Sequence, residues 1–342
     1  TPTVALSTGP DPVAVTDDGS AYFADYYTAG WSGIVEIARS SGAMHRIYEF
    51  PAPQYQVYQA EFDGRWLVWT LSPQIVNPEP LSLMAWDSRA GTVTTLVSAQ
   101  AATQVVGFTV ATAGRGASDG DLAWSVVDDI SAGPTQFFVR SLNSGIGQSV
   151  TTSGAGAIGW FIADRYVYTF GRHAFYGATT PLEIAALTVP GWASTNVPVG
   201  TGDGIRASLD EGDQPVVTSR GVFWTDRTAG GIKDWAAGET GPVVLISSSG
   251  PEFGRSAGRL FGWVSQSLSD GDVDQQYVAD LRSGSYAAVN WEWLSATGQE
   301  LLVEAYAGAP DGSKLNPRGT TSFLSIDSLP PLPGCSHRSG SR

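Results

Sequence analysis

Short apolar bursts recur along the chain, and each of them ends in polar residues. They read RWLVWTL from Arg65, DLAWSVV from Asp121, RYVYTF from Arg165 and RLFGWVS from Arg259. Each burst is short and rich in aromatic and β-branched residues, which is typical of a buried strand. No long stretch has helical periodicity, so the pattern predicts an all-β protein with little helix.

Two series of glycines repeat with the same period as the bursts. The first series lies in turns directly before the bursts, about 46 residues apart on average: Gly19, Gly64, Gly120, Gly221, Gly258 and Gly298, with Asp164 and Arg165 at the equivalent turn. The second lies in a following hairpin: Gly42, Gly91, Gly145, Gly191, Gly238 and Gly284. A repeat of this length indicates a solenoid or a propeller.

Each repeat reads as four strands separated by turns. In the second unit the predicted strands are Tyr55–Phe62, Arg65–Leu71, Leu81–Asp87 and Thr92–Ser98. Four-stranded antiparallel units of this length are typical of β-propeller blades.

The two ends of the chain predict how the ring closes. The last unit supplies strands at 290–296, 300–306 and 321–327 and then runs into SLPPLPG, where the prolines cannot donate to a sheet. The segment Thr3–Ser7 resembles the fourth strands of other units. We therefore predict a seven-bladed β-propeller of four-stranded antiparallel blades, closed by the N-terminal strand. It would form one domain over residues 1–334, followed by a tail at 335–342.

The chain resembles seven-bladed propellers of the TolB-like and WD-repeat type. The segments VTDDGSAYFADYY, from Val15, and SATGQELLVEAY, from Ser295, are similar to the turn and strand of TolB-type repeats. The resemblance covers almost the whole chain but is architectural, because the Ser-Pro-Asp-Gly turn of these families is absent and their Trp-Asp ending occurs in one repeat alone, at Trp86-Asp87. Propellers host many different functions, so this architectural resemblance implies no particular activity.

Charge and composition narrow the class of partner. The net charge of -14 disfavours nucleic acid and anionic membrane surfaces, which would repel the protein, and no apolar run is long enough to span a membrane.

The single cysteine, Cys335, cannot form an internal disulfide. Because the chain begins at Thr1, we expect either a mature secreted protein or a shortened chain, and we expect a monomer.

Polar and aromatic residues follow the second strands or precede the first strands, where loops of a propeller converge on its central channel. Acids, arginines and aromatic rings together suit a sugar, and we expect an extracellular glycan or protein ligand at the channel mouth. The candidate ligand-binding residues are Asp25, Tyr27, Asp128, Asp226, Arg227, Arg255, Trp291, Trp293 and Glu304. Tyr55 and Tyr58 also lie where the chain enters a first strand.

Two enzymatic alternatives and a scaffold remain open. A polysaccharide lyase would use His173 as general base, with Arg172 or Arg227 holding a substrate carboxylate and Tyr176 as acid. A glycoside hydrolase would instead use a pair of the acids that follow second strands. A protein-interaction scaffold would need neither.

The alternating acids Asp270, Asp272 and Asp274 have the spacing of a calcium-binding loop. The segment departs from the EF-hand at Gln275, where glycine is required, and at Leu281, where a glutamate should be. We therefore expect no cofactor, with calcium at these three carboxylates as the alternative.

Overall fold

In the computed structural model of the chain, the residues described are 3–4, 11–25, 30–73, 81–98, 104–110, 120–127, 134–155, 159–163, 166–170, 183–186, 216–217, 221–226, 231–236, 240, 243–247, 251–265, 275–283, 285–289, 291–297, 299–307, 316–330 and 332. The protein is all-β. Over these residues it forms seven antiparallel sheets, six of four strands and one of three, and its one helical element is the 3-10 turn η2 at Ile326–Ser328.

The first three sheets follow the chain without a crossover. Sheet 1 contains β2 (Asp11–Val15), β3 (Ala21–Asp25), β4 (Gly33–Ile37) and β5 (Met44–Glu49). Sheet 2 contains β6 (Gln56–Phe62), β7 (Trp66–Ser72), β8 (Ser82–Asp87) and β9 (Thr92–Val97). Sheet 3 contains β10 (Gln104–Val110), β11 (Asp121–Val127), β12 (Pro134–Ser141) and β13 (Gly147–Ala155).

The remaining sheets repeat this order, and the last one also receives the N-terminal strand. Sheet 4 contains β14 (Gly159–Ala163), β15 (Tyr166–Phe170) and β16 (Glu183–Ala186). Sheet 5 contains β17 (Val216–Val217), β18 (Gly221–Asp226), β19 (Gly231–Ala236) and β20 (Val243–Ile246). Sheet 6 contains β21 (Pro251–Ala257), β22 (Leu260–Ser265), β23 (Gln275–Asp280) and β24 (Ser285–Val289). Sheet 7 contains β25 (Trp291–Ala296), β26 (Glu300–Ala307), β27 (Asn316–Ser325) and β1 (Thr3–Val4).

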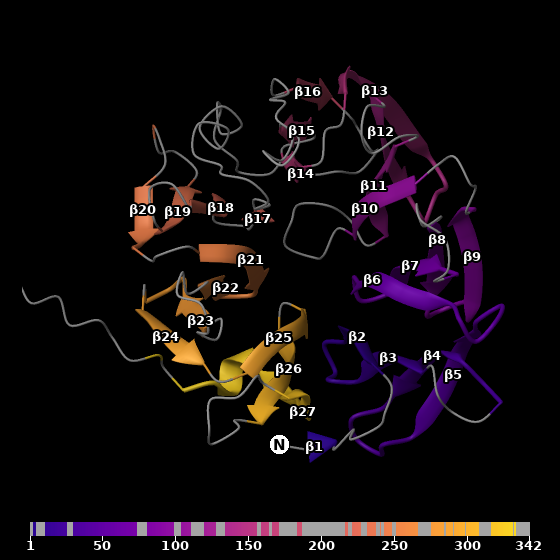
Figure 1. Cartoon of the computed structure of the whole chain (residues 1–342), viewed down its shortest axis with the longest axis horizontal. Coiled ribbons are helices and arrows are strands. Elements are labelled where there is room, and N and C mark those ends of the chain that lie inside the picture. The colour runs from indigo at the N-terminus through magenta and orange to yellow at the C-terminus, as the bar shows by residue number, and fades with distance from the viewer. Residues whose placement is uncertain are drawn as a thin grey trace, which may run out of the picture.

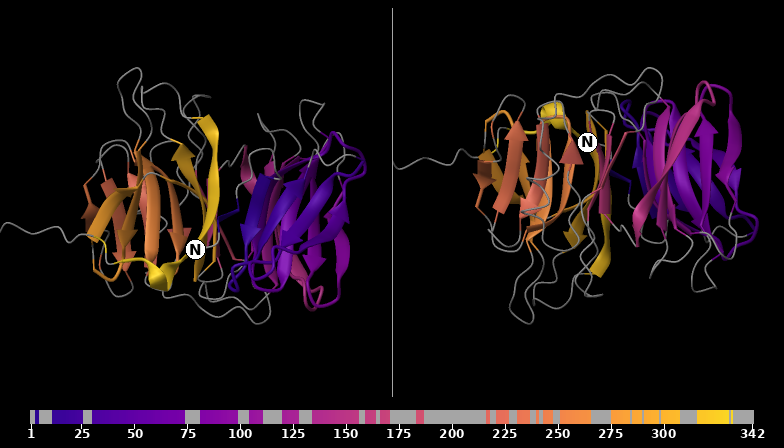
Figure 2. Two further views of the ribbon diagram at one scale, coloured as in Figure 1. Left: turned by 90° about the horizontal axis from the view of Figure 1, so that it is seen from below. Right: turned by 90° about the horizontal axis from the view of Figure 1, so that it is seen from above.

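The sheets follow one another around a common centre in chain order, each with its first strand nearest the centre (Figure 1). First strands of neighbouring sheets contact each other, as β2 contacts β6 and β14 contacts β17, and β2 also contacts β25 of the last sheet. The strands run roughly along the viewing direction of Figure 1, so their connections emerge at two opposite ends (Figure 2). We call the end with the first-to-second and third-to-fourth turns the turn face, and the opposite end the loop face.

The predicted N-terminal pairing is present at two residues. Thr3 pairs with Ser322 and Val4 with Thr321, both in β27. Predicted turns are also confirmed at Gly64 before β7 and Gly91 before β9, which have φ of 105° and 65°, a conformation that glycine adopts without strain. Gly221, also predicted in a turn, is instead the first residue of β18.

The second strands are buried on both sides, which explains their uninterrupted apolar sequences. In β3, Tyr22 and Ala24 pack in a cluster with sheet 2, whereas Ala21 and Phe23 pack in a cluster with sheet 7. All residues of β7 are buried. The hydrophobic core is therefore a series of seams between adjacent sheets.

Polar contacts join the sheets at the turn face. Arg65 binds Asp87 of its own sheet through two nitrogens, and its Nη1 donates to Asn143 Oδ1 of sheet 3 at 2.6 Å. Arg259 repeats the arrangement, binding Asp280 and donating to a main-chain carbonyl of sheet 7. An arginine after the turn thus ties each of these sheets to the next.

Candidate functional site

Many of the predicted site residues lie outside the described part of the chain. The predicted site residues outside the described part are Tyr27, Asp128, Arg172, His173, Tyr176, Arg227, Asp270, Asp272 and Asp274. The roles proposed for them stay predictions. Asp226 ends β18, the second strand of sheet 5, as its position after the apolar burst predicts.

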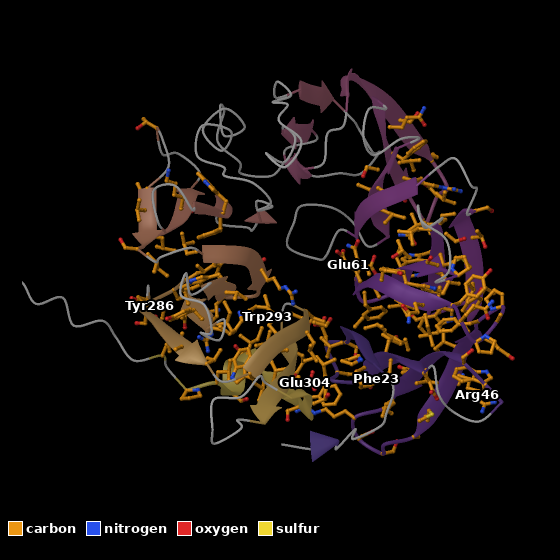
Figure 3. All side chains as sticks on the ribbon, in the orientation of Figure 1. Phe23, Arg46, Glu61, Tyr286, Trp293 and Glu304 are labelled. Carbon is orange, nitrogen blue, oxygen red and sulfur yellow. The ribbon has the colours of Figure 1, made fainter. Side chains whose placement is uncertain are left out.

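Two predicted acids face the same seam, between sheets 7 and 1. Phe23 of β3 packs with Leu302 of β26, and alternation along each strand places Asp25 and Glu304 on these same sides. Figure 3 shows Phe23 and Glu304 on the two adjacent sheets that border this seam. Asp25, at the loop-face end of β3, is 4% exposed, and Glu304 is half-buried. The sequence predicted their shared face of the molecule but not their shared seam.

Trp31 covers the outer part of this seam. Its ring lies so close to Gly33 that a Cβ there would sit 2.7 Å from the ring and 2.0 Å from the carbonyl oxygen of Tyr48. Arg46 of β5 places its guanidinium carbon 4.7 Å from the centre of the Trp31 ring, a cation–π contact. Glycine at position 33 therefore allows the indole to pack against the backbone, with the arginine over the ring.

The predicted residues of β21 and β25 meet in the seam between sheets 6 and 7. Trp293 is 2% exposed and packs in the core, where its ring would lie 2.7 Å from a Cβ at Gly262. Trp291 is half-buried against the same cluster. Arg255 is exposed, and its Nη1 donates to the main-chain carbonyl of Trp293. The contacts described for the Trp293 side chain are thus packing contacts.

The first strands share a feature that sequence reasoning missed. The pairing of the first with the second strand shifts register in sheets 1, 2, 3, 6 and 7, at Pro12/Ala14, Val57/Ala60, Val105/Gly107, Glu252/Arg255 and Trp293/Ser295. Such bulges turn side chains out of the regular alternation and are common next to binding sites. No residue type marks them, because the bulged residues range from valine to tyrosine.

The bulge in β6 turns Tyr58 toward solvent. Its side chain is 51% exposed, although it belongs to the strand of sheet 2 that lies nearest the centre. Next to it, the main-chain N–H of Gln59 donates to the buried hydroxyl of Thr70 at 3.1 Å, which fixes the bulge to β7. The Gln59 amide nitrogen donates to Glu61 Oε1 at 3.3 Å. Figure 3 shows Glu61 at the inner edge of sheet 2.

The strand of sheet 2 that lies nearest the centre therefore carries an exposed aromatic ring and a linked amide and carboxylate. Gln59 and Glu61 were not singled out from the sequence; the available signal was their alternation with the apolar residues Ala60 and Phe62 in an expected strand. Among the described residues no group of three or more His, Cys, Asp or Glu side chains could hold a metal ion. No helix in that part of the chain is long and apolar enough to cross a membrane.

Comparisons with known proteins find similarity to this chain in structure and not in sequence. Neither a protein-family model nor a curated protein sequence matches it. Among solved structures it aligns with an oligogalacturonate lyase in complex with manganese, with a TM-score of 0.55 and 10% identity over 92% of this chain and 88% of the lyase. It also aligns with a prolyl endopeptidase, with a TM-score of 0.52 and 12% identity over 92% of this chain, and spans 48% of that enzyme.

Structures of propellers are also among the matches. The β-propeller domain of the trilobed protease from Pyrococcus furiosus aligns at a TM-score of 0.49 and 12% identity, over 81% of this chain and 82% of the domain. TolB from Acinetobacter baumannii aligns at 0.38 and 11% identity, over 81% of this chain and 52% of TolB. TolB and a propeller domain are thus among the structures that the chain matches, in agreement with the resemblance predicted from the sequence.

Proposed function

We propose that the chain is a seven-bladed β-propeller, closed by its N-terminal strand, that binds an extracellular ligand at the loop-face end of its central channel. Three observations support the closed ring: the seven sheets of the described residues, the pairing of β1 with β27, and the contact of β2 with β25. In this proposal each sheet is one blade. The secreted location and the monomeric state belong to the same proposal.

The observation that carries the ligand-binding role is the exposed ring of Tyr58 on a first strand. A tyrosine ring exposed beside polar side chains has the apolar face and polar tip that are enriched at binding surfaces. Tyr58 lies two residues from the loop-face end of β6, beside Gln59 and close to Glu61. These groups suit a glycan or a projecting protein segment.

Binding by matched variants tests this role. Tyr58→Ala removes the exposed ring at the centre, and Met44→Ala removes an exposed apolar side chain, 58% exposed, from the outermost strand of sheet 1. Each protein would be screened for binding to oligosaccharides and to extracellular proteins, with isothermal titration of every hit. We expect Tyr58→Ala to weaken binding about tenfold or more, and Met44→Ala to leave it unchanged. Equal affinities in all three proteins would place the ligand site elsewhere.

The lyase alternative involves residues outside the described part of the chain, and the hydrolase alternative involves the acids that follow second strands, so both stay predictions. The same screen would measure unsaturated or hydrolysed products as well as binding. Oligogalacturonate belongs in the panel, because a protein named for acting on it has a similar fold.

A further inference from the structure

We propose that the ligand is an uncharged carbohydrate, stacked on Tyr58 and hydrogen-bonded by Gln59 and Glu61. The inference rests on the proposed function and deepens it, because it names the class of ligand for the same site. Three properties of the site support it: the position of the exposed ring, the chemistry of its polar neighbours, and the charge around them.

Tyr58 differs from the other exposed apolar residues in its place in the sheets. The large hydrophobic residues exposed in the described part of the chain are Met44, Tyr58, Ile146, Val243 and Val244. Met44, Val243 and Val244 lie on fourth strands, and Ile146 lies in a third-to-fourth turn. Tyr58 alone in this set is aromatic and lies on a first strand. A sugar ring has an apolar C–H face that can stack on an aromatic ring in this position.

Other aromatic rings of sheets 1 and 2 pack against one another in the core. Tyr22 and Phe62 have ring centres 5.2 Å apart, and Tyr48 and Trp69 have ring centres 5.5 Å apart. Burial raises the pKa of Tyr22 well above its ordinary value, which keeps its phenol neutral.

The polar neighbours match the hydroxyl groups of a sugar. Glutamine can both donate and accept, and an ionised glutamate accepts only, so the linked pair offers planar groups of both kinds to adjacent hydroxyls. The 3.3 Å contact between Gln59 and Glu61 and the 3.1 Å bond from Gln59 to Thr70 hold this pair before a ligand arrives. Preorganised groups lose less conformational entropy when the ligand binds.

The charge around the site favours a neutral sugar over an acidic one. A uronic acid stacked on Tyr58 would place its carboxylate near that of Glu61, and the net charge of -14 would add long-range repulsion. The exposed Arg255 does not belong to the sheet of Tyr58. It lies on β21 of sheet 6, where one of its five donors binds the carbonyl of Trp293.

Titration with matched oligosaccharides tests the inference. Neutral gluco-, manno- and galacto-oligosaccharides would be compared with oligogalacturonate of equal length, at low and at high NaCl. We expect a neutral sugar to bind with an affinity that is the same at both salt concentrations, because no net charge is neutralised. Tyr58→Ala should weaken it about tenfold or more, Tyr58→Phe should keep it within about threefold, and Met44→Ala should leave it unchanged.

Three results would overturn the inference, and they differ in what they leave of the proposed function. Salt-dependent preference for oligogalacturonate, lost in Tyr58→Ala, would exclude a neutral ligand but keep the channel site. Binding of a protein and of none of the sugars, again lost in Tyr58→Ala, would do the same. Binding that no Tyr58 variant changes would overturn both proposals.

Discussion

At the scale of the residue, Asp87 shows how one carboxylate serves two structural roles. It accepts from Arg65, which reaches across to sheet 3, and from the main-chain N–H of Arg89 at 2.9 Å in the hairpin turn. The hydrogen bond from Arg65, followed by the turn N–H groups, lowers the pKa of Asp87 to about 2. The ionised form therefore supports both the turn and the contact between sheets.

This lowered pKa predicts an acid-sensitive contribution to stability. A carboxylate with a folded-state pKa near 2 and an unfolded-state pKa of about 3.9 stabilises the fold above about pH 4, and the contribution is lost as the pH falls toward 2. We expect the urea midpoint of the wild type to exceed that of Asp87→Asn at pH 5 to 7, with the gap shrinking to near zero by pH 2. Unfolding curves at several pH values measure it.

Asp17→Asn is the control for that series, because Asp17 is an exposed aspartate on the turn face. Its midpoint should follow the wild type throughout. A gap for Asp87→Asn that stayed constant from pH 7 to pH 2 would contradict the prediction.

The roles of single residues were the least predictable from the sequence. Asp25 and Trp293 both lie near strand ends, where polar or aromatic residues suggest a ligand site, yet each is buried in a seam. Which side of a strand a residue faces depends on the sheets that flank it, and a single unit of sequence does not contain that information. Bulges add to the difficulty, because one extra residue reverses the alternation after it.

At the scale of the element, the strands and their turns were predictable because they depend on local chemistry. Trp66–Ser72 forms β7 within one residue of the predicted Arg65–Leu71, and Thr92–Val97 forms β9 where Thr92–Ser98 was expected. A run of strand-forming residues with alternating apolar and polar positions, followed by a glycine with positive φ, determines where the strands of such a hairpin begin and end to within a few residues. The contacts between elements of different sheets involve residues far apart in the sequence and could not be read from it.

Asp63 is the clearest of these contacts. Its Oδ1 accepts from the main-chain N–H groups of Arg65 at 2.9 Å and Trp66 at 2.7 Å, inside its own turn. Its Oδ2 accepts from the N–H of Gly120 at 2.6 Å, in the corresponding turn of sheet 3. One buried carboxylate thus joins two neighbouring turns.

Asp63→Asn should weaken this hydrogen-bonded contact between the two turns. The amide oxygen can keep the bonds within the turn, but the NH2 group would face the N–H of Gly120 and leave that buried donor without an acceptor. We expect a loss of about 2 kcal/mol in the free energy of unfolding, measured by urea denaturation. Thr297→Ala is the comparison, because the Thr297 hydroxyl accepts from Gln299 and Glu300 within its turn, and its loss should cost about 1 kcal/mol. Equal costs for the two variants would show that the bond to Gly120 contributes little.

At the scale of the whole molecule, the last sheet depends on a segment from the other end of the chain. The seam between sheets 7 and 1 contains Phe23, Leu302 and Phe323 in one apolar cluster, and Arg39 of sheet 1 lies 3.2 Å from Glu300 of sheet 7. The pairing of β1 with β27 covers the outer edge of the same sheet. The repeat period predicted this arrangement, because a last unit short of one strand needs a strand from elsewhere.

Deletion of residues 1–7 tests closure of the ring. Without Thr3 and Val4, β27 becomes the edge of sheet 7, its main-chain groups lose their partners, and the seam with sheet 1 is held by side chains alone. We expect the melting temperature to fall by about 5 °C and the variant to self-associate more readily through the exposed edge. Deletion of residues 335–342 is the matched control at the other terminus, and it should leave the melting temperature unchanged, as should Cys335→Ser. A deletion of residues 1–7 that melts with the full chain would show that the N-terminal strand does not close the ring.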